Sequence, residues 1–252
     1  MNGYIKALRL PIVVMAGLLA ITAFRVSVWR TEAYLVALFV VIVASSTMIH
    51  NDWRDREHDA KKGKDFALKH SGTFGVFVLL FWVCSLILAI CLWATNPCYG
   101  VISGGIIISG LIYSETRRVP ILPASLVALT SASPVFYAGP SDHRVLFLFL
   151  TSAFLIFGRE VLKDLDDYPH DDGYKWTLPL ALGRRLAKIY AGAIVFLVPL
   201  LALGISTKTL VGMPFLAISA SCLIFDRGHF SAKVLLDIGM AIIIATLIAS
   251  GP

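Results

Sequence analysis

Long uninterrupted runs of apolar residues recur along the whole chain, separated by short stretches that carry charges, glycine or proline. A soluble core helix or strand would instead alternate apolar and polar positions at the helical or strand period. One helix needs about 20 apolar residues to cross a hydrocarbon layer of roughly 30 Å. The runs predict nine membrane-spanning helices, over residues 9–29, 33–50, 73–95, 98–114, 120–138, 143–162, 186–204, 208–225 and 233–250.

The composition agrees with this pattern. Of 252 residues, 58% are hydrophobic and 15% are charged, and the mean hydropathy is +0.80, which no ordinary soluble domain shows. No small-residue cleavage pattern leads from the first run into a soluble domain, so we expect that run to be a retained helix. The predicted fold is an all-α integral membrane protein with one polytopic domain over 1–252. Two helical halves, about 1–119 and 120–252, are expected to enclose a central apolar cavity.

The basic residues predict the orientation of the chain. All of the 22 Lys and Arg except Arg25, Arg30, Arg144 and Lys208 fall in connections that share one side with the amino terminus when nine helices alternate. The positive-inside rule places that side in the cytoplasm of a bacterial or archaeal cell, with the carboxyl terminus outside. The net charge of +6 is mainly this topology signal, and no basic stripe interleaved with aromatic residues indicates nucleic acid binding. The four cysteines lack a metal-type spacing and are expected to pack within the spans.

Half of the 16 acidic residues gather in two short stretches. The first lies in 51–59 and the second in 163–171, and both follow the pattern D-x-x-D-x-x-H-D. The shared carboxylates are separated by a constant 112 residues (164 − 52) and lie at the cytoplasmic ends of the second and sixth predicted helices. They are Asp52, Asp55 and Asp59 in the first cluster, and Asp164, Asp167 and Asp171 in the second.

Carboxylates at positions i, i+3 and i+7 lie along one side of a helix, where like charges repel unless a cation is present. Oxygen ligands without cysteine favour Mg²⁺, which binds a few carboxylates together with water and substrate phosphates. Acidic helix ends are often only solvated or paired with nearby Lys and Arg, but two matching clusters on one side favour a metal and phosphate site. Such a site above an apolar cavity fits a prenyl diphosphate, whose ionisation Mg²⁺ would assist.

These residues resemble the UbiA-type intramembrane prenyltransferases. The first cluster is similar to the family's NDxxDxxxD motif, the second to its DxxxD motif with an extra upstream acid, and Tyr113-x-x-x-Arg117 to its YxxxK motif with Arg in place of Lys. Arg9-Leu10-Pro11 resembles the Arg-Pro that begins the family's first helix. Thr177-Leu178-Pro179 with Leu182-Gly183 resembles its TLP and LG segment, so the resemblance spans most of the chain.

The resemblance implies Mg²⁺ as cofactor, a prenyl diphosphate as donor, an unidentified acceptor and a membrane-lipid environment. It implies metal binding by Asn51, Asp52, Asp55, Asp59, Asp164, Asp167 and Asp171. Catalytic roles are expected for Asp55, Asp59, Asp167 and Asp171. Substrate contacts are expected from Arg9, Asn51, Tyr113, Arg117 and Lys163, and arginine suits a bidentate phosphate contact.

The chain also departs from the family. Of the family's RPxxSG segment only Ser71-Gly72 remains, and Lys61, Lys62, Lys64 or Lys69 would have to replace the lost arginine. A UbiA-type terpene cyclase, in which the cation is quenched internally, stays an alternative. So does a membrane cation transporter, although Asp237 is the one acidic residue clearly inside a predicted span. A membrane phosphotransferase is disfavoured because the DGxxAR start of its motif is missing.

Overall fold

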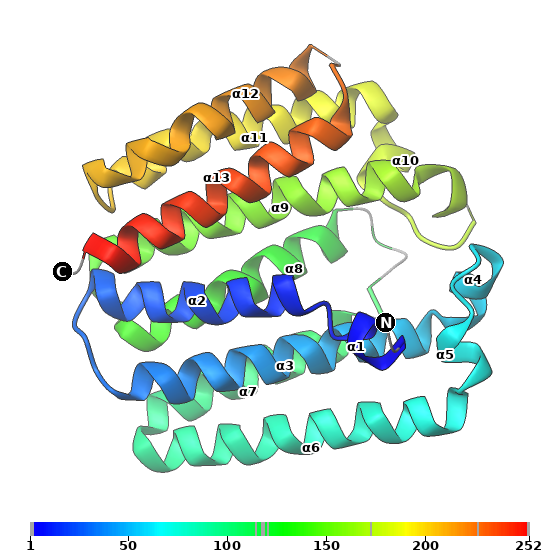
Figure 1. The fold of residues 1–252 in the computed structure, drawn as a ribbon, viewed down its shortest axis with the longest axis horizontal. Coiled ribbons are helices and arrows are strands. Elements are labelled where there is room, and N and C mark those ends of the chain that lie inside the picture. Colours follow the sequence, from blue (N-terminus) through cyan, green and yellow to red (C-terminus); the bar gives the residue numbers. More distant parts are fainter. Residues whose placement is uncertain are drawn as a thin grey trace. The chain divides into compact units, whose positions relative to one another are not determined.

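The computed structural model describes residues 3–113, 115–116, 119, 121–171, 173–225 and 227–250, and these residues form helices joined by turns, with no strand among them (Figure 1). Within these ranges, six helical segments are long and apolar enough to cross a membrane: Glu32–Arg54, Ser71–Thr95, His143–Tyr168, Arg184–Leu203, Thr207–Ile224 and Phe230–Ser250. Three shorter apolar segments are Leu10–Val26, Pro97–Tyr113 and Leu122–Ala138. Each corresponds to one predicted run, which confirms the multi-helix membrane fold.

Helix ends differ from the apolar runs where charged residues follow. The helix predicted over 33–50 continues to Arg54 as α3 (Glu32–Arg54), and the helix predicted over 143–162 continues to Asp171 as α9 (His143–Asp171). The predicted helix boundaries at 50 and 162, which leave the acidic clusters beyond the helices, are therefore wrong for most of the cluster residues. Hydrophobicity ends at the first charges, whereas backbone N–H to C=O hydrogen bonding continues through them.

Two of the predicted spans are composite. α8 (Leu122–Ala132) continues into the 3₁₀ helix η1 (Ser133–Ala138), and the 3₁₀ helix η2 (Thr207–Gly212) precedes α12 (Met213–Ile224). A proline stands at the start of η1 and of α12, where its missing N–H costs no hydrogen bond. The apolar run predicts the span but not this change of helix type.

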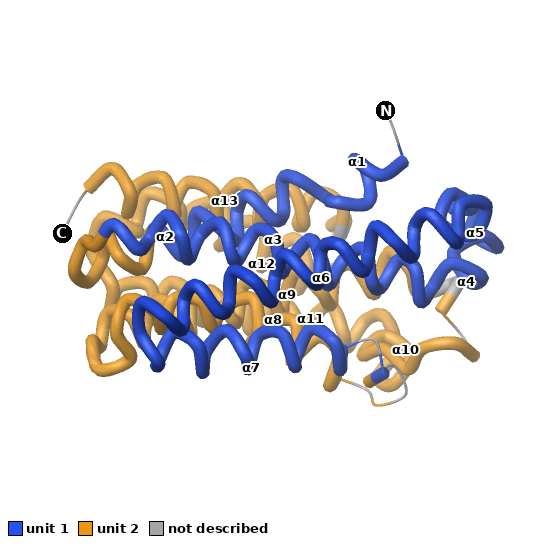
Figure 2. Tube along the Cα trace, turned by 90° about the horizontal axis from the view of Figure 1, so that it is seen from below, with its two compact units in different colours: residues 1–21, 31–115 blue, residues 22–30, 116–252 orange. Residues whose placement is uncertain are grey.

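The described chain divides into two compact units, coloured separately in Figure 2. Unit 1 comprises residues 1–21 and 31–115, and unit 2 comprises residues 22–30 and 116–252, so the division falls within α2 (Leu10–Val26). The other helices of unit 1 are α1 (Gly3–Ala7), α3, α4 (Arg56–Lys61), α5 (Phe66–Lys69), α6 (Ser71–Thr95) and α7 (Pro97–Tyr113). Unit 2 also contains α8, η1, α9, α10 (Leu178–Leu182), α11 (Arg184–Leu203), η2, α12 and α13 (His229–Ser250). A single domain made of two related halves stays a prediction.

In unit 1, α3 packs against both α6 and α7. The α3 side chains Phe39 and Ile49 are fully buried. α7 approaches closely at Gly110, where an added Cβ would lie 2.5 Å from Thr47 Oγ1. The buried hydroxyls of Ser46 and Ser85 join α3 to α6 with a 2.9 Å hydrogen bond. Small residues and paired hydroxyls of this kind are typical of helix packing in membranes.

In unit 2, α11 packs against α9 and α12, and α13 packs against α12 and α9. Figure 1 shows α13, in red, beside α9. The α11 residues that make the contact are small, with Ala187, Ala191 and Val195 all fully buried. Unit 2 thus holds the second acidic cluster on a helix that packs against α11 and α13.

The cysteines do not pack as expected. Cys84, Cys91 and Cys98 are exposed and Cys222 is half-buried, and all four are free thiols. The first two lie on faces of α6 where large apolar side chains such as Leu86 and Ile90 are also exposed. Their position in apolar runs reflects a membrane-facing surface and not a core.

Candidate active site

The first acidic cluster surrounds a break between two helices. α3 ends at Arg54 and α4 begins at Arg56, so Asp55 is the residue at the break. Its N–H still donates to Asn51 O at 2.8 Å, and its C=O accepts from Asp59 N–H at 2.8 Å. The spacing predicted one helix for this cluster. The structure instead distributes the cluster over two helical segments, α3 and α4.

Asp55 is the buried member of this cluster, with only 2% of its surface exposed. Its Oδ2 accepts a hydrogen bond from Asn51 Nδ2 at 3.1 Å. Asp52 and Asp59 are half-buried, and the carboxylate of Asp52 is repelled by those of Asp55 and Asp59. A buried carboxylate with like charges nearby is costly without a compensating cation.

Arg9 supplies one positive charge to this cluster. Its guanidinium nitrogen lies 2.7 Å from Asp52 Oδ1. Arg9 connects α1 to α2 with φ +51°, a left-handed conformation that is unfavourable for a side-chain-bearing residue. The turn therefore places the Arg9 side chain against the first acidic cluster. The strained backbone at Arg9 is of the kind that often occurs at functional sites.

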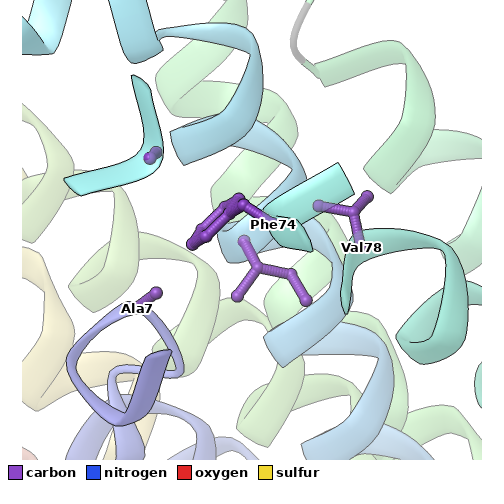
Figure 3. Close-up of a cluster of buried hydrophobic side chains, with 5 residues drawn as sticks. Ala7, Phe74 and Val78 are labelled. Carbon is purple, nitrogen blue, oxygen red and sulfur yellow. The ribbon is translucent and has the colours of Figure 1, made fainter. Parts of the chain in front are cut away.

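A cluster of buried apolar side chains supports the same helix end (Figure 3). Ala7 of α1, Ile49 of α3, Ala67 of α5, and Phe74 and Val78 of α6 form a buried cluster against which Trp53 packs. Trp53 Nε1 donates to Ser71 O at 3.3 Å, and the Arg56 guanidinium lies 4.7 Å from the Trp53 ring centroid. Trp53 follows Asp52 directly, so these contacts fix the backbone that carries the carboxylates.

The second acidic cluster lies on one uninterrupted helix, the last turns of α9. Asp171 is buried, with 1% of its surface exposed, while Asp164 and Asp167 are half-buried. The carboxylate of Asp164 is repelled by Glu160 and Asp171 and attracted by Lys163 and Lys175. For this cluster, the prediction that the carboxylates share one helix is confirmed.

Ion pairs that the spacing did not predict surround this cluster. Lys163 Nζ donates to Glu160 Oε2 at 3.0 Å, one turn away on α9. Arg159 Nε donates to Asp237 Oδ1 of α13 at 2.8 Å, and Lys233 Nζ of α13 donates to Asp166 Oδ2 at 2.9 Å. Asp237 therefore has a cationic partner within the described chain. A single acidic residue inside a predicted span already indicates that such a partner is needed.

Two further predicted features, Tyr113 and the Thr177-Leu178-Pro179 segment, lie at helix ends within the described residues. Tyr113 is half-buried at the end of α7, while Arg117 lies outside the described residues. Arg54 and Glu115 form an ion pair that joins the end of α3 to the segment after α7. The Thr177-Leu178-Pro179 segment begins α10, with Thr177 as its buried N-cap residue.

One of the lysines that could replace the family's lost arginine already forms an ion pair within its own segment. Lys69 Nζ lies 2.7 Å from Asp65 Oδ2, one turn apart across α5. The hydrogen bond from Lys69 holds the pKa of the exposed Asp65 below its usual value. Lys69 is thus paired at the surface, next to the first cluster in the sequence.

The two acidic clusters belong to different units, and their shared role in a metal and phosphate site stays a prediction. Among the described residues, no three His, Cys, Asp or Glu side chains converge into a metal-binding group. Each cluster does bring together several carboxylates, one of them buried. Each also has cationic side chains nearby.

The sequence pattern of the UbiA prenyltransferase family matches residues 10–233, a stretch that contains both acidic clusters. The chain belongs to the UbiA prenyltransferase family. It is therefore a membrane enzyme of the prenyltransferase class, which confirms the predicted family. The roles of the individual motif residues stay predictions.

Relatives of the protein include archaeal enzymes. The digeranylgeranylglyceryl phosphate synthase of Methanothrix thermoacetophila is 28% identical over 250 residues, covering 91% of this chain and 92% of that one. The enzyme of the same name from Saccharolobus solfataricus is 30% identical over 218 residues, covering 79% and 77%.

Solved structures show the same fold. An apo UbiA homologue from Aeropyrum pernix K1 has a TM-score of 0.75 at 16% identity over 95% of both chains. A UbiA homologue from Archaeoglobus fulgidus bound to GPP and Mg²⁺ has a TM-score of 0.68 at 15% identity, covering 98% of this chain and 99% of that one. These likenesses cover nearly the whole chain, so the polytopic helical fold is that of the UbiA proteins.

Proposed function

We propose that the protein transfers a prenyl group from a prenyl diphosphate to a glyceryl phosphate lipid, with Mg²⁺ as cofactor. The observation that carries this proposal is the pair of D-x-x-D-x-x-H-D clusters, each with one buried carboxylate, in a UbiA-family chain. The lipid acceptor is supported by relatives of nearly full length that are named digeranylgeranylglyceryl phosphate synthase.

The donor set fits Mg²⁺. Both clusters offer carboxylate oxygens without thiols, and neither forms a complete protein cage within the described residues. Mg²⁺ characteristically uses one or two carboxylates and completes its coordination with water and substrate phosphates. Asn51, Asp52, Asp55, Asp59, Asp164, Asp167 and Asp171 would hold the metal, which, when bound, neutralises the charge on the leaving diphosphate.

The residues of the protein would then position the donor and stabilise departing charge. Arg9, which already reaches the first cluster, and Lys163 on α9 would bind phosphate oxygens, and Arg117 is proposed for the same role from the sequence. The allylic C–O bond breaks with its electron pair leaving on the diphosphate. A hydroxyl oxygen of the acceptor forms the new C–O bond and its proton is released.

The reaction is tested by product formation in purified, detergent-solubilised protein. Geranylgeranyl diphosphate, Mg²⁺ and geranylgeranylglyceryl phosphate should give a diether phosphate and one equivalent of pyrophosphate, and EDTA should stop both. Pyrophosphate release with an aromatic acid or naphthoate, but not with the glyceryl phosphate, would refute the acceptor. Acceptor-independent formation of a hydrocarbon would show a cyclase, and absence of any release would refute prenyl transfer.

We also propose that the acidic ends of α3 and α9 face the cytoplasm. The proposal rests on the distribution of Lys and Arg, which places the connection before Cys98 on the opposite side from Lys62. In a variant with Cys98 as its single cysteine, a membrane-impermeant maleimide should label intact cells. A cysteine placed at Lys62 in a cysteine-free background should react only after lysis, and the reverse pattern would invert the topology.

A further inference from the structure

Two ion pairs join α9 to α13 within unit 2, beside the second acidic cluster. Arg159 Nε lies 2.8 Å from Asp237 Oδ1, and Lys233 Nζ lies 2.9 Å from Asp166 Oδ2. The partners are seven residues apart on α9 and four apart on α13, and their order is reversed, as antiparallel neighbouring helices require. Figure 1 shows the two helices side by side.

The two α9 partners lie on one face of that helix. At about 100° per residue, Arg159 and Asp166 differ by roughly 20° around the axis. Asp167, Asp171 and Asp164 lie roughly 80°, 120° and 140° from Arg159 on the same scale. The ion pairs therefore hold one face of α9 against α13 while the three predicted metal ligands are directed about a third of a turn away.

The ion pairs also continue toward the predicted ligands. Arg159 lies 3.9 Å from Glu160 Oε1, and Lys163 Nζ lies 3.0 Å from Glu160 Oε2. Glu160 and Lys163 in turn interact electrostatically with Asp164. A charge on α13 is thus linked through Arg159 and Glu160 to the residues next to the second acidic cluster.

Apolar packing alone does not define the rotation of α9. On its buried faces α9 presents fully buried aliphatic residues such as Leu162 and Leu165, which fit several rotations of a helix against apolar neighbours. Opposite charges on two neighbouring helices pair in one register. For Arg159 and Asp237, which lie inside the membrane-spanning segments, leaving either charge unpaired would be expensive. The two pairs supply the register that aliphatic packing leaves unspecified.

We propose that Arg159, Asp166, Lys233 and Asp237 are positioning residues, which set the rotation of α9 so that Asp164, Asp167 and Asp171 present their carboxylates together to metal and diphosphate. The inference rests on the proposed function and deepens it. None of the four residues is assigned a contact with substrate. Their effect passes through the orientation of α9.

The test uses charge reversal and its rescue in the full-length protein. Lys233→Asp and Asp166→Lys each place like charges together, whereas the double variant restores an opposite-charge pair in reversed order. Asp237→Asn is the milder variant for the second pair. Arg144→Gln removes an ion pair with Asp142 at the other end of α9, 3.1 Å in length, and is the matched control.

Two readouts besides thermal stability are measured for each variant. One is the dissociation constant of Mn²⁺, followed by its electron paramagnetic resonance signal, and the other is the Mg²⁺ concentration at half-maximal prenyl transfer. Each single variant should raise both values at least about threefold, less than the roughly 10- to 100-fold seen when a partner of a metal ligand is removed. The charge-swapped double variant should return within about twofold of wild type, and Arg144→Gln should leave both unchanged.

The outcomes separate this inference from the proposed function. Unchanged metal dependence in the single variants, with only the unfolding temperature lowered, would overturn the positioning role and leave prenyl transfer standing. Failure of the double variant to recover would overturn it as well. If wild-type protein binds Mn²⁺ but forms no prenylated product, prenyl transfer fails while the Mn²⁺ comparison still decides the positioning role. If it binds no Mn²⁺ with or without the donor, both fail.

Discussion

The two acidic clusters share one sequence pattern but are supported in different ways. The first is split by a helix break at Asp55 and is held by segments from elsewhere in unit 1: Arg9 between α1 and α2, and the buried apolar cluster that contains Phe74. The second lies on continuous α9, where Glu160 and Lys163 of the same helix and two residues of α13 form its ion pairs. Two clusters with the same spacing of carboxylates are therefore supported by different contacts.

The two clusters differ in which cations neutralise their carboxylates. At the first cluster one arginine in a strained turn contacts Asp52, so the cluster depends on the position of a short amino-terminal helix. At the second, positive charge comes from lysines along and near α9, which move with the helix. We expect the first cluster to be more sensitive to changes remote in sequence, and the second to changes on α9 and α13.

The largest effect is expected from removing the charge of one carboxylate in either cluster. Asp55→Asn and Asp167→Asn should each lower kcat/KM by about 10²–10³-fold or more, equivalent to ~3–4 kcal/mol of transition-state stabilisation. The asparagines keep the side-chain shape, so circular dichroism should show an unchanged helical content. Pyrophosphate release at donor concentrations well below the KM measures the effect.

Asp65→Asn is the control for this pair, because Asp65 follows the first cluster and 47% of its side-chain surface is exposed. It should retain wild-type turnover. Wild-type activity in either cluster variant would remove that carboxylate from the proposed metal site.

The next effect tests the aromatic support of the first cluster. Phe74→Ala removes a fully buried ring and should lower the free energy of unfolding by about 3–5 kcal/mol. Thermal unfolding in detergent should show it, together with a weaker donor affinity because the cluster against which Trp53 packs loses its largest member. The exposed Phe225, with 71% of its surface accessible, gives the control Phe225→Ala. Equal stability of the two variants would contradict the packing argument.

A smaller effect separates the charge of Arg9 from its backbone conformation. Arg9→Gln and Arg9→Gly both remove the contact with Asp52 and should raise the KM for the donor about tenfold, or ~1.4 kcal/mol. The glycine variant should unfold at the same temperature as the glutamine variant or higher, because φ +51° costs glycine little and other residues about 1 kcal/mol. An unchanged donor KM in both variants would limit Arg9 to a structural role.

The smallest effect concerns a carboxylate outside both clusters. Asp142 precedes α9 and accepts from Arg144 N–H at 2.9 Å. Burial alone would raise the pKa of Asp142, but hydrogen bonds from Arg144 and Ser27 outweigh it and hold that pKa below its ordinary value. The stabilisation is therefore complete above the unfolded-state pKa of about 3.9 and is lost as the pH falls through the lower folded value.

Asp142→Asn should accordingly reduce stability at pH 7 by up to about 1 kcal/mol, the usual worth of a helix N-cap. The difference from wild type should shrink as the pH is lowered below 4, which unfolding temperatures across that range would show. Donor and metal affinities should stay unchanged. A stability difference that persists undiminished at low pH would show that the charge of Asp142 does not matter.

The spans and the family were predictable because both depend on local pattern. Runs of about 20 apolar residues satisfy the requirement of a bilayer whatever their neighbours are, and the motif through Asn51 and Asp59 is contiguous in the sequence. The helix break at Asp55 was not predictable, because i, i+3, i+7 spacing is the same on one helix or two. Nor was the exposure of Cys84 and Cys91, since lipid-facing and core-facing surfaces are both apolar.

By itself, the sequence determined that this protein is a polytopic membrane enzyme of the UbiA prenyltransferase family with two acidic motifs. Tertiary structure decided which carboxylates are buried, and which cations neutralise them. The contact of Arg9 with Asp52 and the pairing of Asp237 with Arg159 join residues far apart in the chain. The burial of Asp55 and Asp171 likewise depends on how the helices pack. Electrostatic energy depends on the distance between charges and on their exposure to water, and both are set by helix packing and not by sequence separation.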